Sequence, residues 1–185
     1  MTTITHLTTA ELDVGLDHIR QAPKDTGILE LIVRRPLTEE REILEEGELD
    51  LQEGLVGDNW GARGSSMTDD GNAHPEMQLN IMNTRAIAHI AQDKDRWQLA
   101  GDQLFIDMDI SEHNMPPGTR LSLGTAIIEV TAIPHNGCKK FVARFGLDAM
   151  QWVNSEEGKK LHLRGINAKV VQAGSISAGD TVNKV

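Results

Sequence analysis

The chain has 185 residues, a formal net charge of −10, one cysteine, three tryptophans, three phenylalanines and no tyrosine. This length suits a single domain with one well-covered core. The acidic balance excludes a general nucleic-acid binder, because concentrated Lys and Arg hold phosphate backbones. One cysteine excludes an internal disulfide, and no apolar stretch approaches the roughly 20 residues of a membrane span. Since the N-terminus also lacks a secretory signal pattern, we expect a cytoplasmic protein that binds neither nucleic acid nor membranes.

Apolar spacing, glycine and proline predict the elements of the first hundred residues. Thr8 and Glu11 match a capping box, which indicates the start of a helix. In chain order we expect a short helix that ends before Pro23, a strand over 27–35, a weaker acidic strand or hairpin over 41–50, a long glycine-rich loop over 52–66, a strand over 77–83 and a helix capped by Asn83 or Thr84.

The second half is β-like up to residue 135, then helical, and then returns to strand. We expect strands over 102–110, 116–124 and 125–135, helices over 138–146, 148–154 and 155–165, and strands over 166–174 and 179–185. The three strands in close succession suggest antiparallel neighbours. Many short strands with a few helices around them predict an α+β fold, a β-barrel-like sheet with peripheral helices.

Charge is distributed unevenly along the chain. Residues 1–60 carry 5 Lys and Arg against 14 Asp and Glu, whereas residues 138–169 carry 7 against 3. The positive segment begins at Cys138, which directs attention to this cysteine and its neighbours.

Two interpretations of Cys138 are open. On a helix that begins near residue 137, Cys138, Phe141 and Phe145 fall on one apolar face, which is typical of a buried core cysteine. Alternatively, a cysteine in the first turn of a helix is favoured as a thiolate by the unpaired backbone N–H groups. Lys140 and Arg144 support the second interpretation, because like charges four residues apart are unfavourable unless an anion or acid lies between them.

The sequence evidence for a metal-binding or nucleotide-binding motif is weak. His135 lies three residues before Cys138, but the remaining histidines are scattered without the spacing of a four-ligand zinc site. A Cys/His nucleophile pair stays possible from the residue types alone. The glycines of the 52–66 segment match neither a dinucleotide fingerprint nor a P-loop.

Several stretches, in their order along the chain, resemble one known family. The resemblance to the MOSC domain, named from the C-terminal part of molybdenum cofactor sulfurases, covers roughly residues 27–183. It rests on "GLVGDNW" (54–60), "LAGDQLFIDMDI" (99–110), "PPGTRLSLGTAIIEVTAIPHNGCKKF" (116–141) and "RGINAKVVQAGSISAGDTV" (164–182). On this basis we expect an N-terminal helical extension over 1–26 and a MOSC domain over 27–185.

The resemblance implies a β-rich barrel whose cysteine works on molybdenum or sulfur. Cys138 would be the catalytic residue, either as a molybdenum ligand or as a sulfur carrier, and the implied cofactor is the molybdenum cofactor, molybdopterin. A thiolate is a soft donor suited to such a metal, and cationic side chains suit the pterin phosphate. The residues expected to bind the cofactor are Asp58, Arg63, Lys139, Lys140, Arg144, Arg164 and Asn167.

The sequence departs from the family pattern at two places. A His-Gly-Gly stretch often follows the Gly-Leu-x-Gly-Asp loop in relatives, and here "SSMTDDGNAHPEMQLN" stands in that region, with His74 as the candidate histidine. A Gly-Glu-Asn-Leu type motif appears as "GDQL" at 101–104.

Two classes of function are therefore open. In the first class, the protein is a molybdenum-dependent oxidoreductase that reduces N-hydroxylated compounds. In the second, it is a persulfide carrier or cofactor-binding module that serves a redox or sulfur-transfer protein partner. An enzyme would need an enclosed pocket for its small-molecule substrate, and a carrier would need an exposed thiol.

Overall fold

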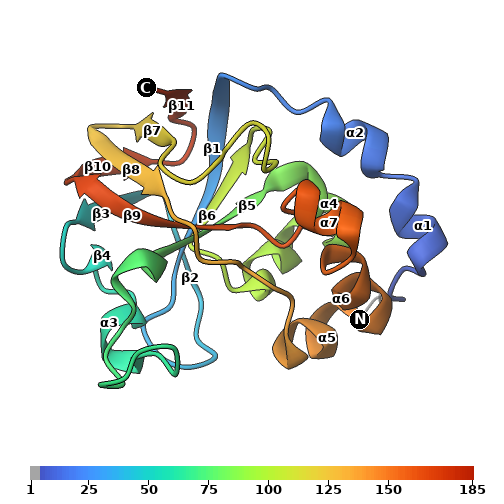
Figure 1. Cartoon of the computed structure of the whole chain (residues 1–185), viewed down its shortest axis with the longest axis horizontal. Helices are drawn as coiled ribbons and strands as arrows, with labels where there is room; N and C mark the ends of the chain where they lie inside the picture. The colour runs from blue at the N-terminus through green and yellow to red at the C-terminus, as the bar shows by residue number, and fades with distance from the viewer. Residues whose placement is uncertain (1–4) are drawn as a thin grey trace.

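A closed, mixed β-barrel lies at the centre of the structure, a computed structural model that describes residues 5–185 (Figure 1). The strands follow one another around the barrel in the order β1, β11, β7, β8, β9, β5, β6 and back to β1. Their bounds are β1 Thr26–Arg34, β5 Leu79–Asn83, β6 Leu104–Asp107, β7 Arg120–Leu123, β8 Ala126–Val130, β9 Ile166–Gln172 and β11 Thr181–Lys184. The predicted α+β barrel with peripheral helices is confirmed.

Strand β1 joins several parts of the sheet. One edge pairs with β6, while the other pairs first with β11 and then with β2 (Glu42–Leu44). All neighbours in the ring are antiparallel except β5 and β6. The expectation that the strand in 102–110 would lie beside the next two strands is therefore wrong for β6. A parallel pair needs a long crossover, and residues 84–103 supply it through α4 (Thr84–Ala91) and η2 (Lys94–Ala100).

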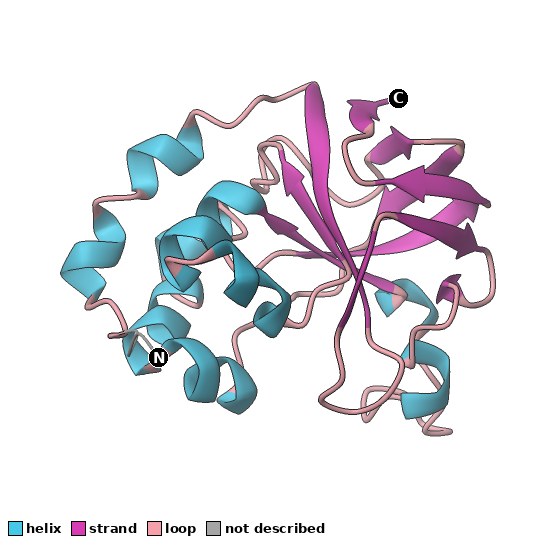
Figure 2. Cartoon of the chain, turned by 180° about the vertical axis from the view of Figure 1, so that it is seen from behind, coloured by secondary structure: helices cyan, strands magenta, loops and turns pink. Residues whose placement is uncertain are grey.

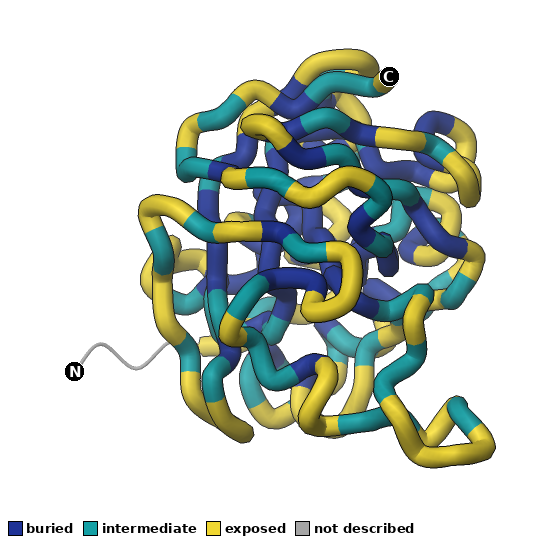
Figure 3. Tube along the Cα trace, turned by 90° about the vertical axis from the view of Figure 1, so that its left-hand side faces the viewer, coloured by how far each residue is buried: buried dark blue, intermediate teal, exposed yellow. Residues whose placement is uncertain are grey.

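Alternating side chains build two apolar layers. Within β1, Leu29 and Ile32 point into the barrel, whereas Leu31 and Val33 pack outside it against helices. Both sets are buried, and Figure 3 shows the buried segments in dark blue at the centre of the molecule. This two-sided burial explains why β1 is an almost continuous apolar run in the sequence.

Most of the helices gather on one side of the barrel (Figure 2). They include α1 (Thr9–Asp13), α2 (Leu16–Arg20), α5 (Lys139–Phe145), α6 (Leu147–Val153) and α7 (Glu156–Lys160). The predicted capping box at Thr8 and Glu11 is confirmed, but the single N-terminal helix is two short helices. They meet at Gly15, where a Cβ atom would lie 2.4 Å from the His89 ring.

The prediction of a long loop over 52–66 is wrong. This segment contains β4 (Gly54–Leu55) and α3 (Trp60–Arg63). Strand β4 pairs with β3 (Glu46–Asp50), which also pairs with β10 (Gly174–Ser177) in a separate small sheet. Leu55 and Trp60 are buried, so tertiary packing holds short elements that local propensity does not predict.

Within the described residues, no helix has the length and hydropathy needed to cross a membrane.

Candidate functional site

Cys138 lies at the N-cap position of α5 and is exposed. Its backbone is extended, with φ −128° and ψ −179°, so the helix begins one residue later and buries Phe141 and Phe145 without the cysteine. The core interpretation of Cys138 is therefore wrong. The preceding Gly137 is fixed by Asn154, whose Oδ1 accepts from the glycine N–H at 2.8 Å and whose Nδ2 donates to its carbonyl at 3.1 Å.

A cavity of about 240 Å³ lies beside Cys138. The helix α5, the connection between β1 and β2, the helix α3 and the segment around Gly101 line it. Six cationic side chains contribute to the lining, namely Arg35, Arg41, Arg63, Lys140, Arg144 and Arg164. The structure thus brings together five of the residues selected from the sequence, namely Arg63, Cys138, Lys140, Arg144 and Arg164.

An acidic side chain of the same chain lies between Lys140 and Arg144. Glu39 accepts from Lys140 Nζ at 2.8 Å and from Arg144 Nη2 at 2.6 Å. The hydrogen bond from Lys140, followed by that from Arg144, lowers the pKa of Glu39 from 4.5 to about 2. The like-charged pair predicted to require an anion or acid between its members is therefore bridged by an internal carboxylate, which leaves a net charge of +1 for the three groups.

A buried ion pair supports the opposite wall. Arg35 donates from Nε and Nη2 to the two carboxylate oxygens of Asp58, at 2.9 and 2.7 Å. Its Nη1 donates to the carbonyl of Gly101 at 2.8 Å. Asp58, expected at the cofactor, instead lies behind the cavity wall and orients Arg35. The signal for Arg35 in the sequence is an arginine directly before Pro36 at the end of a strand, which alone does not indicate a binding residue.

A second buried ion pair joins Arg164 and Asp102. Arg164 Nη1 donates to Asp102 Oδ2 at 2.6 Å, and Nη2 donates to the Ala100 carbonyl at 2.9 Å. The Arg164 guanidinium also lies 5.1 Å from the centre of the Phe141 ring. Burial raises the pKa of the Asp102 carboxyl, although Arg164 acts in the opposite direction. These contacts fix the guanidinium where it reaches the cavity.

His135 lies next to this pair and is neutral. Burial, and then the charges of Arg164 and Arg35, hold the pKa of His135 well below its usual 6.5. Its Nδ1 atom lies 3.5 Å from Asp102 Oδ1, which is within ion-pair range but long for a hydrogen bond. Because the imidazole is neutral, this contact is not an ion pair. Only 14% of the His135 side chain is exposed.

Several buried polar atoms around the cavity lack a hydrogen-bond partner within residues 5–185. They are Asn59 Oδ1, Asp102 Oδ1, His135 Nδ1 and Arg164 Nε. Buried polar atoms are almost always satisfied by protein or water. Asn59, His135 and Arg164 all line the cavity, so its wall offers both donors and acceptors that suit a polar ligand.

Other residues selected from the sequence do not line this cavity. Lys139 is exposed on α5, whereas Asn167 is buried and accepts from Asn80 Nδ2 at 2.7 Å. His74 caps the short helix η1 (Pro75–Met77) by accepting from the Glu76 N–H at 3.2 Å, and it does not line this cavity. The residues that sequence reasoning missed are Arg35, Glu39, Arg41, Asn59 and the cavity role of His135.

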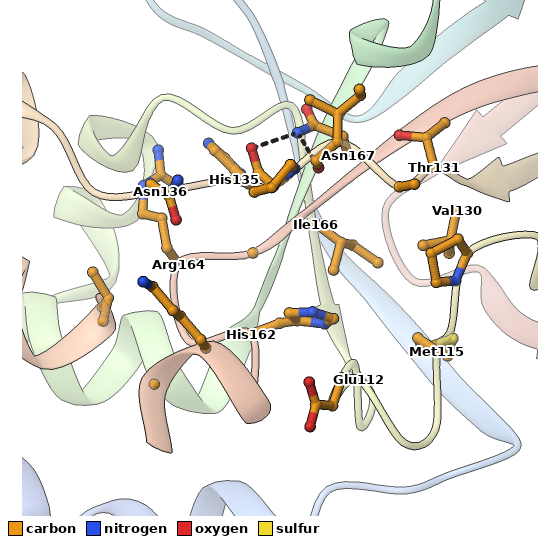
Figure 4. A pocket seen from close by; sticks show the side chains of 18 residues that line it. Glu112, Met115, Val130, Thr131, His135, Asn136, His162, Arg164, Ile166 and Asn167 are labelled. Carbon is orange, nitrogen blue, oxygen red and sulfur yellow. Dashed lines mark hydrogen bonds between the residues drawn. The ribbon is translucent and has the colours of Figure 1, made fainter. Parts of the chain in front are cut away.

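A larger cavity of about 440 Å³ adjoins the first (Figure 4). His135 and Arg164 line both cavities, and Asn167 lines only the larger one. Cys138 belongs to the smaller cavity alone.

Comparison with known families agrees with this architecture. A family model described as the MOSC domain matches residues 68–183. The chain belongs to the MOSC domain family. The matched region of this MOSC protein contains Cys138, Lys140, Arg144 and Arg164, while Arg35 and Glu39 precede it.

Solved structures share the MOSC protein's fold at low sequence identity. The YuaD protein from Bacillus subtilis superposes with a TM-score of 0.60 and 14% identity, covering 85% of this chain and 94% of that one. YiiM from Escherichia coli gives a TM-score of 0.56 and 20% identity, covering 85% of this chain and 69% of that one. No curated protein sequence matches significantly. These likenesses establish the fold.

Proposed function

We propose that this MOSC protein binds the molybdenum cofactor in the 240 Å³ cavity, with the Cys138 thiolate as the metal ligand. The observation that carries the proposal is an exposed thiol at the edge of a cavity lined by six cationic side chains. Membership of a family associated with this cofactor supports the same assignment.

The chemistry of the lining residues fits the cofactor. A thiolate is a soft ligand that suits molybdenum bound to sulfur. Arg63, Lys140 and Arg144 suit a phosphate, since guanidinium and ammonium groups form strong charge-assisted hydrogen bonds with it. The unpaired Asn59 Oδ1 offers an acceptor for pterin N–H groups, and Arg164 Nε offers a donor. A phosphate at Lys140 and Arg144 would displace the carboxylate of Glu39.

When bound, molybdenum supplies redox chemistry to a small molecule such as an N-hydroxylated compound. The chain's own contribution is orientation and charge. Arg35 and Arg164, each fixed by a buried carboxylate, hold their guanidinium groups at the cavity without side-chain motion. His135 stays uncharged because its pKa is lowered, which leaves the positive charge to the arginines.

A second function is favoured by one observation. Cys138 is exposed and has no side-chain capping bond, so its sulfur is open to another protein. A persulfide carrier that serves a sulfur-transfer partner needs such a thiol. The same exposure suits a module that passes bound cofactor to a partner enzyme.

The test is metal, pterin and sulfur analysis of protein purified from a host that makes the cofactor. We expect stoichiometric molybdenum and pterin in the wild type, and loss of molybdenum in Cys138→Ser. Lys140→Ala should lose pterin, whereas Lys139→Ala, the neighbouring lysine outside the cavity, should retain it. Cyanide-labile sulfur on Cys138 without molybdenum or pterin would reject cofactor binding and favour the carrier.

A further inference from the structure

The larger cavity has a lining unlike that of the Cys138 cavity. Its walls are mainly apolar, formed by Met115, Pro117, Val130, Ile133, Pro134, Val153 and Ile166. Arg164 reaches it, but Asp102 already neutralises that charge at 2.6 Å. Glu112 and Lys159, the remaining charged residues of the lining, are exposed. An ion inside would lose its hydration without a free counter-charge, so the cavity suits an uncharged ligand.

His162 projects into this cavity from the segment after α7 (Figure 4). Its Nδ1 lies 2.6 Å from the carbonyl oxygen of Ile110. A carbonyl only accepts, so Nδ1 must carry the proton. In the neutral imidazole Nε2 is then a hydrogen-bond acceptor. Among residues 5–185, the hydrogen bond of the His162 ring is made by Nδ1 and none is made by Nε2.

The backbone at His162 is in the left-handed region, with φ 49°. The surrounding bonds form a Schellman motif at the end of α7: the His162 N–H donates to the Lys159 carbonyl at 3.2 Å, and the Leu163 N–H donates to the Gly158 carbonyl at 2.8 Å. Glycine is the usual residue at this position because it has no Cβ to strain the conformation. A histidine here is less favourable for the helix end but places an imidazole in the cavity. Strained residues of this kind concentrate at ligand sites.

We propose that the 440 Å³ cavity is a second binding site, for an uncharged and largely apolar small molecule that donates a hydrogen bond to His162 Nε2. The volume lies within the usual range for small-molecule sites, about 300–1,000 Å³. A bicyclic aromatic molecule with one N–H or O–H group fits both the lining and the acceptor. The ligand would lie beside the Cys138 cavity, separated from it by His135 and Arg164. This site does not depend on cofactor binding.

A pair of matched probes tests the acceptor. Indole and benzofuran have nearly the same shape, but only indole carries an N–H donor. Amide chemical-shift titrations by NMR should show both probes perturbing Asn136, His162 and Gly165. Indole should bind about tenfold more tightly, the ratio that one hydrogen bond of ordinary strength supports.

Three variants locate the effect. His162→Gly should fold with a melting temperature close to that of the wild type, because glycine at the Schellman position offsets the lost hydrogen bond to Ile110, yet its affinities for indole and benzofuran should be equal. Ile133→Trp, at a partly exposed wall position, should fill the cavity and abolish binding of both probes. Cys138→Ser should leave both affinities unchanged. Equal wild-type affinities, a preference that persists in His162→Gly, absence of binding, or shifts that map outside the cavity would each overturn the proposal.

Discussion

Glu39 Oε2 lies 2.6 Å from Arg144 Nη2, although the two residues are 105 positions apart in the chain. Glu39 follows β1 with a left-handed backbone, φ 67°, and reaches across to α5. A carboxylate therefore stands where the proposed cofactor phosphate would bind. Anion binding at this site is an exchange of one negative group for another.

Replacing Glu39 by glutamine should make anion binding stronger. The neutral amide competes less well for Lys140 and Arg144, so we expect the affinity for inorganic phosphate to rise about tenfold, measured by calorimetry. Glu40→Gln is the matched control, because Glu40 is an exposed neighbour outside the cavity lining. An equal affinity in both variants would mean that Glu39 does not occupy the anion position.

The titration of Glu39 should report the same contact. Its pKa near 2 lies below the usual 4.5, so the carboxylate stays charged as the pH falls and is protonated only near pH 2. Because the folded pKa is lowered, the contact stabilises the protein above about pH 4.5 and this effect is lost as the pH falls toward 2. In Lys140→Ala, carboxyl NMR should find the midpoint of Glu39 nearer 4.5. An unchanged midpoint would contradict the role of Lys140.

Arg164→Ala should destabilise the fold strongly. The variant leaves Asp102 fully buried without its counter-charge, which costs about 3–5 kcal/mol for a broken buried pair. Denaturant unfolding followed by tryptophan fluorescence measures the change. The double variant Arg164→Met, Asp102→Asn should recover most of the loss, since it removes both charges. A single variant within 1 kcal/mol of the wild type would show that water reaches Asp102.

His135 should make the free energy of unfolding depend on pH below about 6.5. Its folded pKa is lowered, so below 6.5 the unfolded chain binds a proton that the folded protein does not. Stability then rises with pH, by up to about 1.4 kcal/mol per pH unit for one group, and levels off above 6.5. Unfolding of His135→Asn, compared with the wild type at each pH, should lack this part of the slope. Identical slopes would place a charged imidazole in the native protein.

Cys138 should react with iodoacetamide in the native protein. Its exposed position before α5 gives the reagent access without unfolding, so we expect the rate to stay within about tenfold of that in denaturant. Mass spectrometry measures the adduct, and Cys138→Ser is the blank. A thiol modified only after denaturation would contradict the exposed geometry on which both proposed functions depend.

Elements with strong local signals were predictable from the sequence. Strand β1 is an almost continuous apolar segment, β5 is followed by the helix cap Asn83, and Ser155 caps α7. Each of these features can be recognised from the sequence alone. Strand β4 has only two residues and depends on its pairing with β3, so the glycines of the 52–66 segment indicate a loop instead. The parallel pairing of β6 with β5 depends on a long crossover, and the spacing of apolar residues does not reveal such a connection.

The candidate site was predictable to a similar degree. The cluster around Cys138 follows from local charge, and the spacing of Lys140 and Arg144 predicts an acid or anion between them. That this group is Glu39 depends on the path of the chain between β1 and β2. Arg35 and His135 are recognisable only once Asp58 and Asp102 are seen buried beside them.

The pairing of β1 with β11 has a consequence for synthesis. The first strand of the barrel finds one of its partners in the last strand, through the register of Thr26 with Asn183. During translation, the start of β1, residues 26–28, must therefore stay without this partner until β11 leaves the ribosome. Open strand edges invite association between chains, and such distant pairings form slowly. On a polysome crowded with identical chains, the period before β11 emerges is when this protein has most need of a chaperone.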